Sequence, residues 1–309
     1  MITLIIAGFS FAQNKSPAGK TYNASIKHGN LEREYRIYVP LNYDKKKSYP
    51  LLLALHGGGG NSDHMEKLTN WGFNKLADKE GFFVLYPEGI DKHWNDGRKG
   101  VNYKAHKKNI DDVGFLSALI DRFAKIYSID KKRVYSTGIS NGGLMSFRLA
   151  CEIPEKIAAI AVVTACMPED LVLTCSTARA VPVLVIDGNN DPLMPWDGGR
   201  VGFFGVVNLG RVLSVAETVS FWVKHNNCET SPAVTPLPDF DPGDGTKVTK
   251  EVYGNGDNNS EVVLYTVMSG GHTWPDGWQY LPESIIGKTS RDINANEAIW
   301  GFLKKHSIK

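Results

Sequence analysis

The sequence predicts one α/β domain built on a mostly parallel, doubly wound central sheet with helices on both faces. Short apolar runs recur without alternation, which is typical of strands buried on both faces. Amphipathic segments of helical period separate several of these runs. The 309 residues are 42% hydrophobic and 22% charged, which fits an ordinary globular protein and excludes a disordered or collagen-like chain.

The expected strands follow in order along the chain. Residues 34–39 (EYRIYV) alternate and predict a half-buried strand. Residues 247–253 also alternate, and we expect them to form a hairpin with 262–268. Continuous apolar runs predict buried strands at 50–56, 81–87, 133–137, 157–164, 181–187 and 262–268.

The expected helices lie between these strands. Residues 112–127 place apolar side chains three and four positions apart, on one helical face. Residues 214–225 show the same spacing, with Ser214 as the expected N-cap. A third helix-compatible run covers residues 144–150.

Three segments define the expected organisation of the chain. Residues 1–12 are uncharged, mostly apolar and end in Ser10-Phe11-Ala12, so we expect a signal peptide that lacks a basic start; a buried first strand is the alternative. Residues 13–30 are then an N-terminal extension, and residues 31–309 a single domain. Residues 230–260 are rich in Pro, Asp, Gly and Asn, which predicts a polar elaboration of the sheet edge.

Charge and cysteines narrow the expected partners and cofactors. The net charge of +2 provides no electrostatic footprint for nucleic acid, and no later segment is apolar enough for a membrane helix. No Cys-x-x-Cys pair or EF-hand spacing is present, so we expect no metal and no cofactor. The sequence leaves the oligomeric state open. Export would allow disulfides, and the four cysteines (Cys151, Cys166, Cys175 and Cys228) permit three full pairings. Four buried thiols in a reduced protein are the alternative.

Residues 138–142 (GISNG) match G-x-S-x-G between an expected strand and an expected helix. This context predicts a nucleophile elbow that presents Ser140 on a sharp turn. A serine hydroxyl needs a base, and His272 lies in a glycine-rich loop after the last apolar strand. Asp191 is the expected acid; Asp187 is its rival but lies at the end of its strand, where we expect it to be too deep.

Acyl transfer also needs two N–H donors for the developing oxyanion. We expect one from Asn141 and the other from the glycine tract 56–61, at Gly58 with Gly59 as the alternative. Aromatic residues in neighbouring loops are candidates for substrate binding, together with the apolar loop 201–209. They are Trp94, Trp196 and Trp274.

Taken together, these motifs resemble the secreted polyhydroxybutyrate depolymerase and feruloyl esterase family, close to the acetyl xylan esterases. The resemblance covers roughly residues 25–305. It implies an α/β-hydrolase fold, an extracellular or periplasmic setting, no metal, and a triad of Ser140, Asp191 and His272. The motifs that carry it are 56–61 (HGGGGN), 86–89 (YPEG), 111–115 (DDVGF), 138–143 (GISNGG), Asn190-Asp191-Pro192 with Pro195, and 270–275 (GGHTWP).

The expected function is therefore secreted serine carboxylic-ester hydrolysis through an acyl-enzyme. The expected substrates are feruloyl or acetyl esters of plant polysaccharide, or hydroxyalkanoate-type polyesters and their oligomers. Two alternatives stay open on the same fold: a serine peptidase, and a binding protein that has lost its chemistry.

Overall fold

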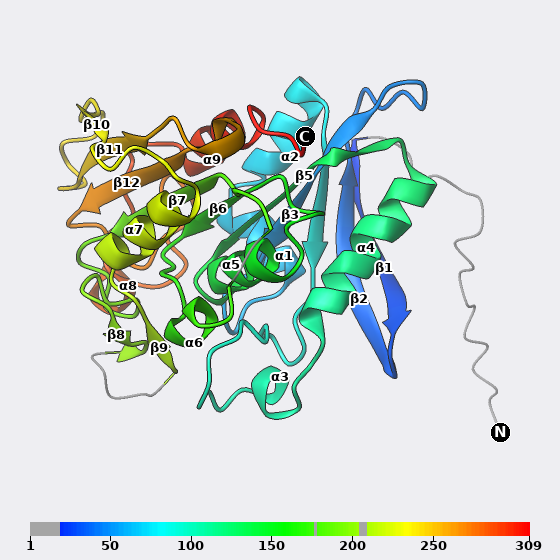
Figure 1. The fold of residues 1–309 in the computed structure, drawn as a ribbon, viewed down its shortest axis with the longest axis horizontal. Helices are drawn as coiled ribbons and strands as arrows, with labels where there is room; N and C mark the ends of the chain where they lie inside the picture. The colour runs from blue at the N-terminus through cyan, green and yellow to red at the C-terminus, as the bar shows by residue number, and fades with distance from the viewer. Residues whose placement is uncertain (1–18, 176–177, 204–208) are drawn as a thin grey trace.

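The computed structural model describes residues 19–175, 178–203 and 209–309, and they form an α/β fold (Figure 1). The expected signal peptide at 1–12 lies outside the described residues. Within the described part, the main sheet has ten strands in the order β1-β2-β4-β3-β5-β6-β7-β12-β11-β10. Their bounds are β1 Lys20–His28, β2 Leu31–Val39, β3 Tyr49–Leu55, β4 Phe83–Pro87, β5 Ile129–Ile139, β6 Ala159–Val163, β7 Val183–Gly188, β10 Ala233–Pro236, β11 Lys247–Tyr253 and β12 Val262–Met268.

The central strands from β4 to β12 pair in parallel, and the strands at both edges pair antiparallel. The predicted hairpin of β11 with β12 is confirmed. Residues 20–28 fall in the expected N-terminal extension, yet they form β1 and pair with β2 along its whole length. Because the carboxyl ends of parallel strands meet at one edge, the loops after β3, β5, β7 and β12 converge there.

Helices cover both faces of the sheet. The core on one face contains residues of α4, α5 and α7, which lie in front of the sheet in Figure 1. The core on the other face contains residues of α1, α2 and α9. The helix bounds are α1 Ser62–Leu68, α2 Gly72–Glu80, α3 Lys104–Lys107, α4 Asp112–Ile126, α5 Asn141–Glu152, α6 Glu169–Val172, α7 Val215–His225, α8 Glu283–Ile286 and α9 Ala295–Leu303. No helix within the described ranges has the length and apolar character to cross a bilayer.

The sequence pattern explains several of these boundaries. Ser214 caps α7 through a capping box with Glu217, as its position before the apolar period predicted. The four central strands β3, β4, β6 and β7 are buried along their whole length, which accounts for their unbroken apolar runs. Two short strands, β8 (Gly199–Arg200) and β9 (Arg211–Val212), form a separate antiparallel pair.

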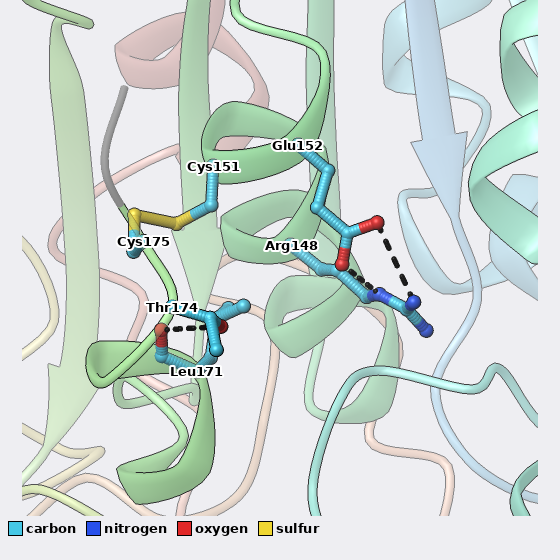
Figure 2. The surroundings of a disulfide bond; sticks show 6 residues. All are labelled: Arg148, Cys151, Glu152, Leu171, Thr174 and Cys175. Carbon is cyan, nitrogen blue, oxygen red and sulfur yellow. Dashed lines mark hydrogen bonds and ion pairs between the residues drawn. A yellow bond between two sulfur atoms is a disulfide. The ribbon is translucent and has the colours of Figure 1, made fainter.

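One disulfide is present among the described residues, between Cys151 near the end of α5 and Cys175 just after α6 (Figure 2). Cys166 and Cys228 are buried free thiols. The disulfide therefore ties the far end of the helix that begins at the nucleophile elbow to the segment around α6. Beside it, Arg148 and Glu152 form an ion pair along α5.

Candidate active site

Ser140 lies at the junction of β5 and α5 with a φ of +53°, a strained value for a residue with a side chain. The neighbouring glycines are required by close backbone contacts. A Cβ on Gly142 would lie 2.3 Å from the carbonyl oxygen of Leu55, and a Cβ on Gly138 would lie 2.5 Å from the carbonyl carbon of Gly142. The G-x-S-x-G pattern thus forms the sharp turn that its sequence context predicted.

His272 and Asp191 are joined by a hydrogen bond of 2.7 Å between Nδ1 and Oδ2. Because a carboxylate only accepts, Nδ1 carries the proton and Nε2 is available as a base. The other Asp191 oxygen accepts the backbone N–H groups of Leu193 and Met194 at 2.7 and 2.8 Å. The Tyr280 hydroxyl donates to the His272 carbonyl oxygen at 3.0 Å. Both partners of the imidazole–carboxylate pair are therefore held in place.

Ser140 and His272 line the same cavity, which has a volume of about 210 Å³. The cavity brings together the loop after β3, the elbow after β5 and the loop after β12. The Ser140 hydroxyl forms no hydrogen bond within the described residues, and such contacts are often long until substrate binds. Apolar side chains supply much of the remaining lining, namely Met65, Leu68, Ile139, Leu193, Val201, Phe203, Leu209, Leu281 and Ile286.

The rival carboxylate, Asp187, has a different environment. It is 3% exposed and accepts the backbone N–H of Ala165 at 2.9 Å. Burial, and then the charge of Asp191, raise the pKa of Asp187 well above its usual range. The surroundings of Asp187 therefore favour its neutral form, while Asp191 contacts the imidazole, in line with their expected depths.

The glycine tract after β3 supplies one candidate oxyanion donor. Gly59 donates its N–H to the Lys92 carbonyl oxygen at 2.9 Å, which removes the alternative donor. Gly58 lines the cavity, as does Asn141, and neither backbone N–H has an acceptor in the described part of the chain. These two groups are free to bind an oxygen next to Ser140.

His56 fixes this tract rather than taking part in chemistry. Its Nδ1 donates to the Gly57 carbonyl oxygen at 2.8 Å, and its Nε2 accepts the Gly89 N–H at 3.0 Å. Burial lowers the pKa of His56 to about 4 despite the opposing hydrogen bond to Gly57. The ring is therefore neutral near pH 7, as a structural histidine.

The three predicted substrate-binding tryptophans do not line the cavity, and this prediction is corrected. Trp94 is 0% exposed, and its indole N–H donates to the His56 carbonyl oxygen at 2.9 Å. Trp274 is also buried, with its indole N–H directed to Asn296 at 3.2 Å. Trp196 packs against the core. A large aromatic ring with one N–H donor can fill the core under a loop and bond to that loop or its neighbours. Trp94 and Trp274 have this structural role.

Other polar and aromatic side chains line the cavity instead. Four of them were not predicted from the sequence: His64, Arg98, Tyr103 and Tyr280. Tyr280 lies eight residues after His272, so its proximity was a usable signal. Residues 98 and 103 lie in a polar stretch without a motif. The expected apolar loop contributes Val201, Phe203 and Leu209, while residues 204–208 lie outside the described residues.

Several known proteins that are similar to this chain carry esterase names. The family model described as Esterase PHB depolymerase matches residues 33–197. NocK of Nocardia uniformis subsp. tsuyamanensis, which carries an esterase name, is 33% identical over 278 residues, 88% of this chain and 79% of that protein. Feruloyl esterase C of Emericella nidulans is 27% identical over 245 residues, 78% of this chain and 76% of that protein.

A solved structure shows the same fold. The crystal structure of a thermostable esterase superposes with a TM-score of 0.56 at 17% identity, covering 93% of this chain and 63% of that one. With a family model that covers more than half of the chain and a relative similar over most of its length, the chain belongs to the esterase PHB depolymerase family and is a carboxylic ester hydrolase.

Proposed function

We propose that the enzyme is a serine esterase whose nucleophile, base and acid are Ser140, His272 and Asp191. One observation carries this proposal. The imidazole that is bonded to Asp191 shares a cavity with Ser140, and Gly58 and Asn141, whose backbone N–H groups have no acceptor among the described residues, line the same cavity. A hydroxyl, an oriented base and free N–H donors are the groups that acyl transfer requires.

In the proposed mechanism, Ser140 Oγ forms a bond to the ester carbonyl carbon while His272 Nε2 takes the hydroxyl proton. The negative carbonyl oxygen of the tetrahedral intermediate accepts from Gly58 and Asn141 N–H. The carbon–oxygen bond to the alcohol then breaks, and His272 returns the proton to the leaving alcohol. Water attacks the acyl-enzyme by the same route and releases the acid, and Asp191 stabilises each imidazolium.

Substitution of the nucleophile tests this assignment. Ser140→Ala should lower kcat for p-nitrophenyl acetate by on the order of 10³ or more and abolish labelling by a fluorophosphonate probe. Ser136→Ala is the matched control, since Ser136 is a buried serine of β5 that bonds to Ser146 at 2.8 Å. The control should keep labelling and turnover. Near-normal turnover by Ser140→Ala would remove that serine from its role.

We propose that the substrates are feruloyl or acetyl esters of plant polysaccharide, or hydroxyalkanoate-type polyesters and their oligomers. Support comes from the mostly apolar cavity with aromatic side chains, which suits an aryl or short acyl group. The name of the similar Feruloyl esterase C points the same way. An initial-rate panel of methyl ferulate, acetylated xylan and polyhydroxybutyrate, beside short p-nitrophenyl esters, tests the range; turnover of the short esters alone would contradict it.

We also propose that the enzyme acts outside the cytosol. The disulfide between Cys151 and Cys175 supports this location, because such bonds persist mainly in oxidising compartments. Fractionation of the producing cells, with non-reducing peptide mapping of the recovered enzyme, should find it oxidised in the periplasm or medium. Recovery in the cytosol with both thiols reduced would contradict the proposal.

A further inference from the structure

Asp96 is a buried carboxylate next to the site, and the mechanism above does not use it. It lies in the loop between β4 and α3 and is 0% exposed. Its Oδ1 accepts from His106 Nε2 at 3.0 Å and its Oδ2 from Arg98 Nη2 at 2.6 Å. Oδ2 also accepts from the side-chain amide of Asn141 at 2.6 Å. The last contact reaches a residue of the candidate oxyanion site.

The side chain of Asn141 is locked by these contacts. Its Oδ1 accepts the Trp94 N–H at 2.8 Å, and its Nδ2 donates to the Trp94 carbonyl oxygen at 3.0 Å. The second Nδ2 hydrogen goes to Asp96, so both hydrogens are used. A flipped amide would bring donor against donor and acceptor against acceptor at Trp94. The side chain therefore holds in place a residue that lines the cavity and whose backbone N–H has no acceptor among the described residues.

The same carboxylate also holds the cavity wall. Arg98 lines the cavity, its side chain is 2% exposed, and it donates to the Leu209 carbonyl oxygen. Burial alone would raise the pKa of Asp96, but Arg98 and His106 outweigh it and hold that pKa well below its usual range. Asp96, whose charged form is favoured by these two partners, thus joins Asn141 to Arg98 and, through Arg98, to the cavity wall at Leu209.

We propose that Asp96 is a positioning residue for the oxyanion site, acting through the side chain of Asn141. The inference rests on the proposed function, in which the Asn141 N–H binds the oxyanion. A donor stabilises the transition state only where the developing charge will be, so a loosened donor lowers kcat more than it weakens substrate binding.

Asp96→Asn keeps the shape and removes one acceptor. Whichever way the new amide lies, its NH₂ group faces a donor: Asn141 and Arg98 Nη2 on one side, or His106 on the other. We expect kcat to fall on the order of 10- to 100-fold with KM within about 3-fold of wild type. The affinity for a trifluoromethyl ketone transition-state analogue should fall by the same factor as kcat, while that for the acid product should not.

Asp112→Asn is the matched control. Asp112 is also 0% exposed, pairs with Arg33 at 2.6 Å and accepts the N–H of Asn95 in the same loop, but it does not bond to Asn141. Thermal unfolding of both variants should show comparable losses, and only Asp96→Asn should lose transition-state affinity. Equal losses of kcat in the two variants, or wild-type kcat in Asp96→Asn, would overturn the proposal.

Asn141→Ala provides a second route that does not depend on the folding of Asp96→Asn. It keeps the backbone N–H of residue 141 and removes the side-chain hydrogen bonds to Asp96 and Trp94, so kcat should fall by a similar factor. In the double variant the two losses should not add, because both break one linkage. Additive losses, or wild-type kcat in Asn141→Ala, would refute the linkage.

Fluorophosphonate labelling separates the two proposals. If wild-type enzyme hydrolyses esters without labelling at Ser140, the oxyanion site is elsewhere and both proposals fall. If Ser140 is labelled at the same rate in Asp96→Asn as in wild type, the proposed function stands and the positioning role alone falls.

Discussion

The two sides of the cavity are built differently. The anchored side consists of the lining residues Gly58, Ser140 and Asn141. Behind them, Trp94 and Asp96 hold the Asn141 side chain through buried hydrogen bonds, and Ser140 has a strained backbone. The outer wall includes Phe203 and Leu281, whose exposed fractions are 36% and 41%. Beside this wall lies Trp278, which is 46% exposed and contacts the lining residue His64, with ring centroids 5.7 Å apart.

The difference follows from what each side must do. Groups that meet developing charge need fixed positions, which burial and complete hydrogen bonding supply. Surfaces that select a substrate must be accessible to it and gain from apolar area rather than from one geometry. Changes on the anchored side should therefore alter kcat, and changes on the outer wall should alter KM and the choice among esters.

The sharpest test compares the two carboxylates behind the base. Asp191→Asn should lower kcat by on the order of 10⁴, because an amide disfavours the imidazole tautomer that activates Ser140. Asp187→Asn should keep kcat within about 3-fold, since a protonated carboxyl is replaced by a neutral group of the same shape. Initial rates on p-nitrophenyl acetate measure both, and the reverse ranking would make Asp187 the acid.

The same pair predicts a pH effect on stability. The folded-state pKa of Asp187 is raised above the value of about 3.9 in an unfolded chain. Its stabilising contribution is thus complete below that pH and declines as pH rises toward the folded pKa. Asp187→Asn should gain stability relative to wild type between pH 4 and pH 8, measured by urea unfolding. A difference independent of pH would show that the pKa of Asp187 is the same in the folded and the unfolded chain.

Removal of the disulfide should affect stability and spare chemistry. Cys151 and Cys175 are 24 residues apart, and a loop of that size contributes about 3 kcal/mol to unfolding. Cys151→Ser with Cys175→Ser should lose about that much and keep wild-type kcat, because the bond lies at the end of α5 away from Ser140. Dithiothreitol should destabilise wild type and leave the double variant unchanged; an equal response would exclude this bond as the cause.

Acid should weaken the fold through His56. Its folded-state pKa of about 4 lies below that of an unfolded histidine, so between pH 6.5 and 4 only the unfolded chain takes up the proton. This group alone accounts for a loss of about 3 kcal/mol on lowering the pH from 7 to 4. His56→Gln should show a smaller acid loss in guanidinium unfolding, and an unchanged loss would assign the effect to other groups.

The smallest expected effects distinguish a tryptophan with a structural role from one that contacts substrate. Trp94→Phe removes the indole hydrogen bond to His56 and should cost about 1 kcal/mol of stability while KM stays unchanged. Trp278→Ala should raise KM for methyl ferulate about 2- to 5-fold with little change in stability. If Trp94→Phe raised KM instead, the tryptophan would contact substrate after all.

The candidate catalytic motifs stand out in the sequence because their local geometry restricts residue type. Only glycine is tolerated at positions 138 and 142, where backbone atoms lie within 2.5 Å of a Cβ position. A serine, an acid and a histidine after separate strands follow from the parallel sheet, which collects those loops at one edge. The central strands were visible as unbroken apolar runs for the same structural reason.

The direction in which the tryptophan side chains point could not be predicted from the sequence. Trp94 and Trp274 lie next to the motifs in sequence, and that nearness suggested substrate contact. In the fold both rings point into the core and each indole N–H finds an internal acceptor. Nearness along a loop does not determine which way a side chain points, since packing against distant segments decides it.

The sequence by itself determined the fold class, the elbow at Ser140 and the candidates for base and acid, because local backbone geometry and strand order restrict those residues. Only the tertiary structure placed Asp191 rather than Asp187 against His272, selected the Cys151–Cys175 pair, and joined Asp96 to Asn141. Each of these depends on distances between segments far apart in the chain, which packing sets and residue patterns do not encode.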